Sequence, residues 1–356
     1  MVTTSATPAS PSPSTELRLP GMDDITDADA SGAAPAEPPD AAGSATPPAR
    51  EARTGGVLVI GGAGFIGSHL VDRLIAEGRS VDVVDDLSTG SLGNLSSART
   101  EASRLDVGEL HIHTLDACSD DLATLVAMRR PREIFHLALV TRHDESAVGL
   151  GRSFTSMLGV LDAARRSGVA KVVAALPATA LYGQPSGRDL PVKEGALAPR
   201  GVRGVVAKAI VELLSAYRED WGIEFTALAV SSVYGPRQRP DGGVVASLVA
   251  AAAAGRAPRL SGDGRQSRDF VYVDDVVDAL VRSAGRGSGL VVNIGTGVQT
   301  SLRDLWKLIA PDGAEPTNVA ARSDEVLRFA VSPVRARIHL AWSPWTSLTE
   351  GLDALR

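Results

Sequence analysis

The chain has 356 residues, 44% of them hydrophobic, and a formal net charge of −6 at pH 7. This length and composition allow a large buried core, and the mildly acidic balance gives no sign of a nucleic-acid partner. No apolar run approaches the roughly 18 residues that would suggest a membrane helix. The one cysteine, Cys118, excludes an internal disulfide and a thiolate metal cluster. We expect Cys118 to be a small buried core residue of a cytoplasmic protein.

Residues 1–54 differ from the rest of the chain because they are crowded with Ala, Pro, Ser, Thr and acidic residues and have no periodic apolar face. Such a segment cannot bury enough apolar surface to fold, so we expect a disordered tail. Its start also lacks the basic and apolar regions of a secretory signal. We therefore divide the chain into this tail, a mainly cofactor-binding domain over residues 55–235 and a mainly substrate-binding lobe over residues 236–356, the last two interleaved.

The first periodic stretch, residues 57–60, has the pattern of a buried strand, and Gly61, Gly64 and Gly67 follow it before a helix predicted over residues 68–77. In a dinucleotide-binding turn the first glycine permits the tight turn, the second lets backbone N–H groups approach a pyrophosphate, and the third lets the helix pack closely. The N-terminus of the helix then faces the anion. A glycine pattern alone is weak evidence, but the strand before it and the helix after it favour a cofactor site.

A second apolar run, residues 81–84, ends in Asp85 and Asp86. This is about the interval at which the fold places a carboxylate on the adenosine ribose hydroxyls. Asp85 should therefore favour NAD over NADP. The turn-rich segment after it, starting at Leu87 and Ser88, falls where ligands of doubly wound sheets collect.

Alternating apolar residues over 110–116 predict a third strand, which ends at Asp116 near the adenine edge of the site. Its His111 and His113 lie on one strand face with the spacing of a metal pair. Without nearby cysteines or a third ligand, ordinary surface histidines are the better interpretation.

Strands and helices continue to alternate along the chain. Further strands are predicted over residues 133–138, 171–176 and 225–230, and further helices over residues 121–130, 153–167 and 205–217. This order predicts right-handed crossovers and a doubly wound parallel sheet of the Rossmann α/β class, followed by a smaller C-terminal lobe.

Several ordered blocks give the chain, from about residue 57 to 352, a resemblance to the extended short-chain dehydrogenase/reductase family. The blocks are Gly-Gly-Ala-Gly-Phe-Ile-Gly at 61–67, Asp-Asp-Leu-Ser-Thr-Gly at 85–90, His-Leu-Ala at 136–138, Val-Tyr-Gly-Pro-Arg-Gln at 233–238 and Gly-Asp-Gly-Arg-Gln-Ser-Arg-Asp-Phe at 262–270. Within that family the chain is similar to the NAD-dependent nucleotide-sugar epimerases and dehydratases of the UDP-galactose 4-epimerase type. The resemblance implies a bound NAD that removes a hydride from a sugar carbon and later returns it, a nucleotide-diphosphate sugar as substrate, and a homodimer.

The resemblance and the fold together assign further residues near the strand ends to the NAD site. In addition to the glycines and the two aspartates, they are Phe65, Ile66, Leu87, Ser88, Asp116, Ala117, Leu137, Ala138, Ser153 and Lys208. Phe65 and Ile66 are expected chiefly to pack, and Ser153 replaces an asparagine of the family.

The catalytic positions of the family are only partly kept. Its Tyr-x-x-x-Lys pair places the lysine at Lys208, but Gly204 stands four residues earlier, and none of the four tyrosines precedes a lysine by four residues. The family's Ser/Thr position is occupied by Ala178, beside Thr179. We expect Lys208, Thr179 and Tyr182 to be the remaining candidates for proton transfer.

The substrate positions are better kept. By resemblance, Arg268 and Arg322 clamp the nucleotide diphosphate, for which a guanidinium fork is well suited, although surface ion pairs are the simpler alternative. Glu325 stands where the family often has an aspartate on the nucleotide ribose, and Ser232 replaces the usual asparagine.

Two functions therefore remain open. The first is an NDP-hexose 4-epimerase with an atypical acid/base, because general acid–base catalysis contributes a factor of roughly 10² to 10⁴ and its loss does not remove hydride chemistry. The second is a pseudoenzyme that binds NAD and a nucleotide sugar as a partner subunit or scaffold. An apolar gap beside Gly204 would favour the second, and a hydroxyl near the nicotinamide would favour the first.

Overall fold

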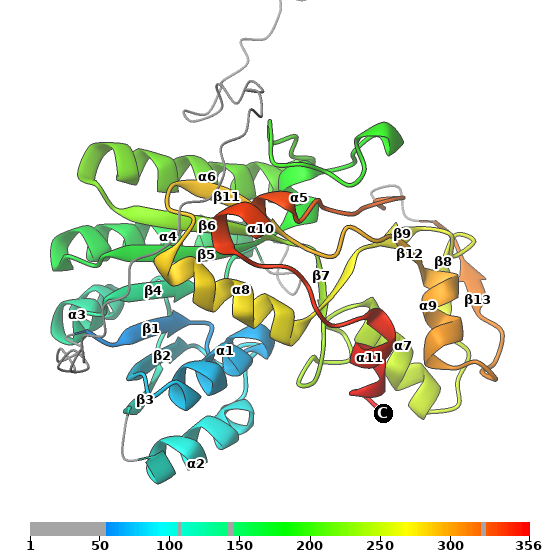
Figure 1. The fold of residues 1–356 in the computed structure, drawn as a ribbon, viewed down its shortest axis with the longest axis horizontal. Helices are drawn as coiled ribbons and strands as arrows, with labels where there is room; N and C mark the ends of the chain where they lie inside the picture. The colour runs from blue at the N-terminus through cyan, green and yellow to red at the C-terminus, as the bar shows by residue number, and fades with distance from the viewer. Residues whose placement is uncertain (1–54, 106–107, 141–145, 322–324) are drawn as a thin grey trace, which may run out of the picture. The chain divides into compact units, whose positions relative to one another are not determined.

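A seven-stranded parallel sheet forms the centre of the fold (Figure 1), with the strand order β11-β6-β5-β4-β1-β2-β3. In chain order the strands are β1 (Val57–Ile60), β2 (Val81–Asp85), β3 (Leu110–Thr114), β4 (Glu133–His136), β5 (Lys171–Pro177), β6 (Glu224–Val230) and β11 (Leu290–Ile294). The computed structural model describes residues 55–105, 108–140, 146–321 and 325–356. The tail over residues 1–54 and Arg322 lie outside this range. The predicted Rossmann class is confirmed.

The strand order reverses between β1 and β4. From β1 the chain runs outward through β2 to β3, and then returns to place β4 on the opposite side of β1. Ligands of open α/β sheets bind outside the carboxyl ends of the strands at such a reversal. The glycine turn after β1 lies at this point.

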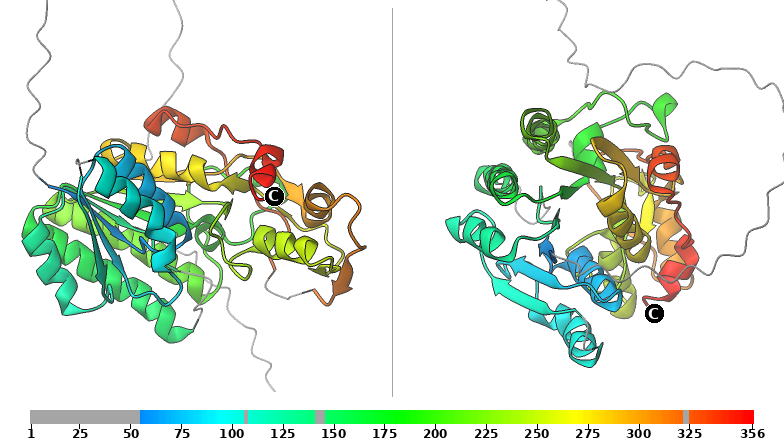
Figure 2. Two further views of the ribbon diagram at one scale, coloured as in Figure 1. Left: turned by 90° about the horizontal axis from the view of Figure 1, so that it is seen from below. Right: turned by 60° about the vertical axis from the view of Figure 1, so that its left-hand side comes forward.

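Helices cover both faces of the sheet, as Figure 2 shows. The first layer contains α1 (Phe65–Ala76), α2 (Ser96–Leu105) and α8 (Val273–Gly285), and the second contains α3 (Asp120–Arg129), α4 (Ala147–Ser167) and α6 (Gly201–Trp221). Successive residues of β1 point to opposite layers, Val57 and Val59 to the first and Leu58 and Ile60 to the second. Burial on both faces explains why these strands are continuously apolar instead of alternating.

Four of these helices begin earlier than the sequence pattern predicts, α1 at residue 65 and α3 at residue 120, and the differences are largest at α4 and α6. Helix α4 begins at Ala147, because the Ser146 Oγ accepts a hydrogen bond from the Gly149 amide at 3.1 Å and caps it. Helix α6 begins at Gly201, so that Gly204 lies in its first turn. The predicted starts at residues 153 and 205 were wrong because the apolar face of each first turn is incomplete.

The C-terminal part of the chain adds three two-stranded sheets. They pair β7 (Ser232–Tyr234) with β10 (Phe270–Tyr272), β9 (Ser267–Arg268) with β12 (Thr300–Ser301), and β8 (Arg259–Ser261) with β13 (Thr317–Val319). The remaining helices are α5 (Ala178–Tyr182), α7 (Val244–Ala253), α9 (Leu302–Ile309), α10 (Val334–Leu340) and α11 (Leu348–Asp353), with single turns η1 (Leu92–Leu95) and η2 (Gly187–Asp189). Because β11 and α8 join the central sheet and its helical layer, the division at residue 235 stays a prediction.

Asp269 connects three segments of this C-terminal part. Its carboxylate is fully buried and accepts hydrogen bonds from the Thr296 amide at 2.8 Å, the Thr296 hydroxyl at 2.6 Å, the Gly297 amide at 3.0 Å and the Val331 amide at 3.2 Å. Four donors converge on one side chain, so Asp269 stabilises the crossing of β10, the loop after β11 and the final segment.

Candidate cofactor and catalytic site

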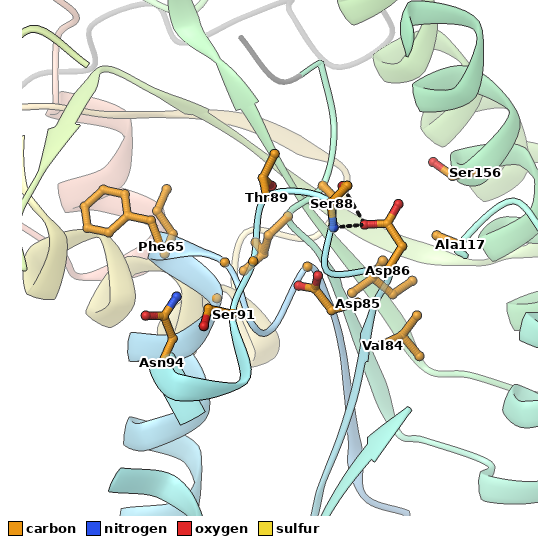
Figure 3. A pocket seen from close by; sticks show the side chains of 18 of the residues that line it. Phe65, Val84, Asp85, Asp86, Ser88, Thr89, Ser91, Asn94, Ala117 and Ser156 are labelled. Carbon is orange, nitrogen blue, oxygen red and sulfur yellow. Dashed lines mark hydrogen bonds between the residues drawn. The ribbon is translucent and has the colours of Figure 1, made fainter. Parts of the chain in front are cut away.

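A cavity of about 1130 Å³ opens at the carboxyl ends of β1, β2 and β4 (Figure 3). Most of the residues predicted to hold the cofactor line it. They are Gly61, Gly64, Phe65, Ile66, Gly67, Asp85, Asp86, Ser88, Asp116, Ala117, Leu137, Ala138 and Ser153. Leu87 and Lys208 do not belong to the lining, so the structure brings together all but two of the predicted set.

The glycine turn has the shape that the sequence predicts. Gly61 has a φ of +81°, and a Cβ built at Gly67 would lie 2.0 Å from the Gly61 carbonyl oxygen. Only glycine therefore lets α1 start this close to β1. The first turn of α1 contains no acidic residue, which leaves its positive end available to an anion at the cavity wall.

The two aspartates after β2 differ in their surroundings. Asp85 is 8% exposed, and its two oxygens accept hydrogen bonds from the Ala63 and Leu87 amides, each at 2.9 Å. Burial raises the pKa of the Asp85 carboxyl. The Asp86 side chain is 41% exposed, and its Oδ1 accepts hydrogen bonds from the Ser88 amide at 3.0 Å and the Ser88 hydroxyl at 2.6 Å (Figure 3). Asp85 thus connects the glycine turn to the loop after β2, and both carboxylates line the cavity.

The segment after β3 and helix α4 each add one residue that the sequence analysis misplaced or missed. Cys118 is half-buried and lines the cavity, so the prediction that it is a core residue was wrong; β3 ends at Thr114, before this position. Burial raises the pKa of its thiol. Arg152 also lines the cavity, and its Nη2 lies 2.8 Å from the Asp116 Oδ1. Recognising Ser146 as a helix cap would have placed Arg152 inside α4.

A loop from the C-terminal part contributes a further wall of the cavity, next to α1. Arg237, with a φ of +63°, and its neighbours up to Gly242 line this wall. The Arg237 Nη2 lies 2.6 Å from the Oδ2 of Asp72 on α1. This ion pair holds an uncommon left-handed backbone in place beside the start of α1.

Buried polar contacts shape the end of β4. Val140 is a β-branched residue with a φ of +49°; its amide donates to the Ser153 Oγ at 3.0 Å, and its carbonyl accepts from the Arg203 Nη2 at 3.0 Å. His136 is fully buried with its Nε2 3.0 Å from the Ser156 hydroxyl. Burial lowers the pKa of His136 to about 3, so this histidine is neutral at physiological pH.

The structure closes the position where the family has its tyrosine. Gly204 is buried in α6, and a Cβ built there would lie 2.8 Å from the Ala180 carbonyl oxygen and 2.9 Å from the Pro199 Cβ. Because one of these neighbours is backbone and the other is a proline ring, the helix packs directly on α5 and leaves no gap for a side chain.

The other catalytic candidates are placed as follows. Ala178 is fully buried; Thr179 beside it is half-buried, and its hydroxyl hydrogen-bonds to none of the described residues. Tyr182 is 3% exposed and its hydroxyl donates to the Asn293 Oδ1 at 2.7 Å. Burial raises the pKa of Tyr182 far above its usual value. Lys208 is 37% exposed, with its Nζ 3.6 Å from a carboxylate oxygen of Glu212 one turn along α6.

Two of the predicted substrate residues lie together, away from the cavity lining. The Arg268 Nη2 is 4.0 Å from the Glu325 Oε1. Glu325 also accepts hydrogen bonds from the Ser261 hydroxyl at 2.6 Å and the Gln266 amide at 3.0 Å, a partner that the sequence analysis missed. Ser232 lies in β7, and its amide donates to the Asp269 carbonyl at 3.0 Å.

The predicted metal alternative has no support among the described residues. His111 contacts Glu109 at 3.0 Å and His113 contacts Asp82 at 2.9 Å. In the described part of the chain, no three His, Cys, Asp or Glu side chains are grouped so that they could hold a metal ion, and no helix is long and apolar enough to span a membrane.

Comparisons with known proteins agree with this geometry. The model of the NAD dependent epimerase/dehydratase family matches residues 57–295. The chain is 39% identical to the UDP-glucose 4-epimerase of Mycolicibacterium smegmatis over 311 residues, which cover 83% of this chain and 95% of that protein. The solved UDP-glucose 4-epimerase of Thermotoga maritima, with UDP-glucose, has a TM-score of 0.77 at 32% identity, covering 84% of this chain and 96% of that chain. The UDP-glucose 4-epimerase of Thermus thermophilus, in complex with NAD, has a TM-score of 0.75 at 28% identity, covering 84% and 98%.

This chain therefore belongs to the NAD dependent epimerase/dehydratase family, and NAD is its cofactor. The predicted resemblance and cofactor are confirmed. The cavity fits that cofactor: the cradle at Gly61 and Gly67 has no room for side chains, the start of α1 accepts an anion, and carboxylates follow β2.

Proposed function

We propose that this protein is a nucleotide-sugar 4-epimerase with an atypical acid/base. Its substrate is a nucleotide-diphosphate sugar, with the ribose and phosphates near Glu325 and Arg268. The cofactor cavity, lined by all but two of the predicted residues, carries this proposal, and the similarity to UDP-glucose 4-epimerases along most of the chain supports it. NAD, when bound, supplies reversible hydride transfer at a sugar carbon. The side chains then have to bind the sugar, orient it and move the proton of its hydroxyl.

We assign the proton-handling hydroxyl to Thr179. It is half-buried, it has no hydrogen-bond partner among the described residues, and it stands next to the family's Ser/Thr position. Tyr182 is unsuited to this role, because its proton is donated to Asn293 and its raised pKa disfavours the phenolate. Thr179 would accept the proton of the reacting sugar hydroxyl on its oxygen as its own hydroxyl proton passes to a water molecule, so that the side chain stays neutral; Lys208, the lysine of the family's pair, lies outside the cavity lining.

The packing at Gly204 favours a second function. A helix that has closed over the tyrosine position, with Ala180 and Pro199 in contact, is the arrangement expected of a protein that no longer uses the position. The protein would then bind NAD and a nucleotide sugar as a pseudoenzyme, in the role of partner subunit or scaffold. The apolar gap beside Gly204 that the sequence analysis named as the sign of a pseudoenzyme is absent, so this interpretation is supported only by the close packing of α6 on Ala180 and Pro199.

The test uses the full chain with NAD and, in turn, UDP-glucose, UDP-N-acetylglucosamine and dTDP-glucose. Absorbance at 340 nm follows reduction of the nicotinamide, and chromatography separates the epimers. The epimerase proposal expects an epimer of at least one sugar, and expects Thr179→Val to lower turnover by roughly 10² to 10⁴ because the hydroxyl is lost at nearly constant volume.

Thr179→Ser is the matched control and should keep most of the turnover. Calorimetry of NAD binding to both variants separates a catalytic loss from a damaged fold. If a nucleotide sugar binds but gives neither an epimer nor a change at 340 nm, the pseudoenzyme is the correct function. If epimers form equally well with Thr179→Val, the assignment of Thr179 is refuted and the epimerase stands.

We further propose a cytoplasmic homodimer that pairs α4 and α6 of each subunit. Leu158 on α4 is 41% exposed, and Val202 and Val205 on α6 are 68% and 60% exposed. These helices contact each other in the second helical layer, and each of them exposes apolar side chains that a second subunit could cover. Analytical ultracentrifugation of the chain and of Val205→Lys tests the pairing, since a buried charge would dissociate the dimer.

A further inference from the structure

The segment after β4, residues 137–140, forms part of the cofactor cavity, because Leu137 and Ala138 line it. The Leu137 amide donates to the Ile60 carbonyl at 2.9 Å. A Cβ built at Gly61 would lie 3.2 Å from the Ala138 Cβ, so the segment packs directly on the glycine turn. A displacement of the segment would therefore change the cavity wall beside that turn.

Val140 ends this segment in an unfavourable backbone conformation. Its φ of +49° lies in the left-handed region, which a β-branched residue rarely adopts. Its side chain is fully buried among the apolar residues of the second helical layer. Backbone outliers of this kind persist only where the surrounding structure holds them, and they cluster at functional sites.

Two helices hold Val140, one at each of its backbone polar groups. The amide donates to the Ser153 Oγ of α4 at 3.0 Å. The carbonyl accepts from the Arg203 Nη2 of α6 at 3.0 Å and from its Nε at 3.3 Å. Hydrogen bonds from a charged donor are stronger than those between neutral groups, so we expect the guanidinium to be the more important of the two supports.

Arg203 also connects α6 to the cofactor cavity, which the family's positions on this helix do not do here. Gly204 has no side chain. Lys208 does not line the cavity, and its Nζ lies 3.6 Å from a carboxylate oxygen of Glu212. Arg203, by contrast, contacts the segment whose first two residues are part of the cavity wall.

We propose that Arg203 is a positioning residue of the cofactor site, which holds Val140 in its left-handed conformation and thereby fixes the segment after β4 against the glycine turn. This role depends on the family's cofactor and not on the proposed epimerase activity. Without the guanidinium, fewer molecules have the segment in the conformation that binds NAD. The apparent dissociation constant of NAD then rises in inverse proportion to that fraction.

The test measures the dissociation constant of NAD by calorimetry, with the full chain and no sugar. Arg203→Met keeps a long side chain but removes the donors, and we expect it to weaken NAD binding about tenfold, as when about one molecule in ten keeps the competent segment. Arg203→Lys keeps a charged donor and should stay within about threefold of the parent. Hydrogen exchange of the peptide that contains Val140 should be faster in Arg203→Met.

Val140→Gly separates positioning from a general loss of stability. Glycine adopts a positive φ about as readily as a negative one, so the segment then needs less support from α6. Adding Arg203→Met to Val140→Gly should weaken NAD binding by less than about threefold relative to Val140→Gly alone. Arg218→Met is the matched control, because Arg218 lies near the other end of α6 and pairs with Glu224; its NAD affinity should equal that of the parent.

The role of Arg203 is overturned if Arg203→Met binds NAD as tightly as the parent, or if it weakens binding equally in the parent and in Val140→Gly. It is also overturned if Arg203→Lys binds NAD no better than Arg203→Met. If Arg203→Met does not fold in a urea unfolding experiment, Arg203→Gln takes its place in both backgrounds, since its shorter neutral side chain cannot support the Val140 carbonyl as the guanidinium does. Because only cofactor binding is measured, a pseudoenzyme would give the same result as an active epimerase.

Discussion

Replacing Gly204 by alanine tests whether α6 has closed over the tyrosine position. The new Cβ would lie 2.8 Å from the Ala180 carbonyl oxygen and 2.9 Å from the Pro199 Cβ. Overpacking of this kind costs about 1–3 kcal/mol, and the better helix propensity of alanine returns about 1 kcal/mol. The net expectation is a free energy of unfolding about 0–2 kcal/mol below that of the parent.

Gly159→Ala is the matched control because Gly159 lies in α4 with no heavy atom within 4 Å of its built Cβ. That variant should gain about 0.5–1 kcal/mol from helix propensity alone. Urea unfolding of both variants gives the difference, which we expect to be about 1–3 kcal/mol in favour of Gly159→Ala. If Gly204→Ala is as stable as the control, the position has room for a side chain and the packing argument fails. Gly204→Tyr should then also fold and be able to restore the dyad.

Three other residues give independent predictions. Asp269→Ala leaves the buried Val331 amide and three partly buried donors without their acceptor, so urea unfolding should show a loss of at least about 3 kcal/mol. NAD at ten times its dissociation constant should slow alkylation of Cys118 about tenfold, since the bound form is shielded, and the raised pKa of the thiol should make labelling faster as pH rises past 9. His136 takes up a proton readily only when unfolded, because its folded pKa is about 3 against an ordinary 6.5. Protonation of His136 in the unfolded chain should therefore lower the free energy of unfolding by up to about 1.4 kcal/mol for each pH unit below 6.5.

Each of these has its own control. Asp353→Ala removes an exposed carboxylate whose ion-pair partner, among the residues that the structure describes, is Arg356 alone, and it should cost less than about 1 kcal/mol; an equal cost at both sites would refute the role of Asp269. Cys118→Ser shows that the label reports on the one cysteine, and unchanged labelling with bound NAD would place the thiol outside the site. His136→Gln should flatten the acid side of the stability curve, and an unaltered slope would mean that other groups carry it.

The cofactor cradle could be predicted from the sequence because its parts are local. Gly61, Gly64 and Gly67 come after β1, and Asp85 is the last residue of β2, so strand and turn patterns suffice to bring them to one end of the sheet. Parallel strands that are buried on both faces can also be recognised in the sequence, because they are continuous apolar runs. The Rossmann class and NAD follow from these signals together.

The remaining features depend on contacts between distant segments. Arg152 meets Asp116 across 36 residues, and Tyr182 gives its proton to Asn293 across 111 residues. The sequence shows that Gly204 replaces a tyrosine, but the closeness of α6 to Ala180 is set by how two helices pack. Tertiary contacts thus determine which polar groups are free to react, and local sequence patterns do not predict these contacts.

The place of β11 in the sheet has a consequence for synthesis of the chain. The last residue that lines the cavity is Gly242, whereas β11, which covers the outer edge of β6, begins only at Leu290. A growing chain can therefore complete its nucleotide cradle while one edge of β6 is still unpaired, and an open strand edge invites pairing with other chains. NAD bound at that stage would stabilise the strands that form the cofactor site, but it would leave the free edge of β6 unpaired. Ribosomal stalling between these two points should yield aggregates that NAD does not prevent, and release past Ile294 should end that vulnerability.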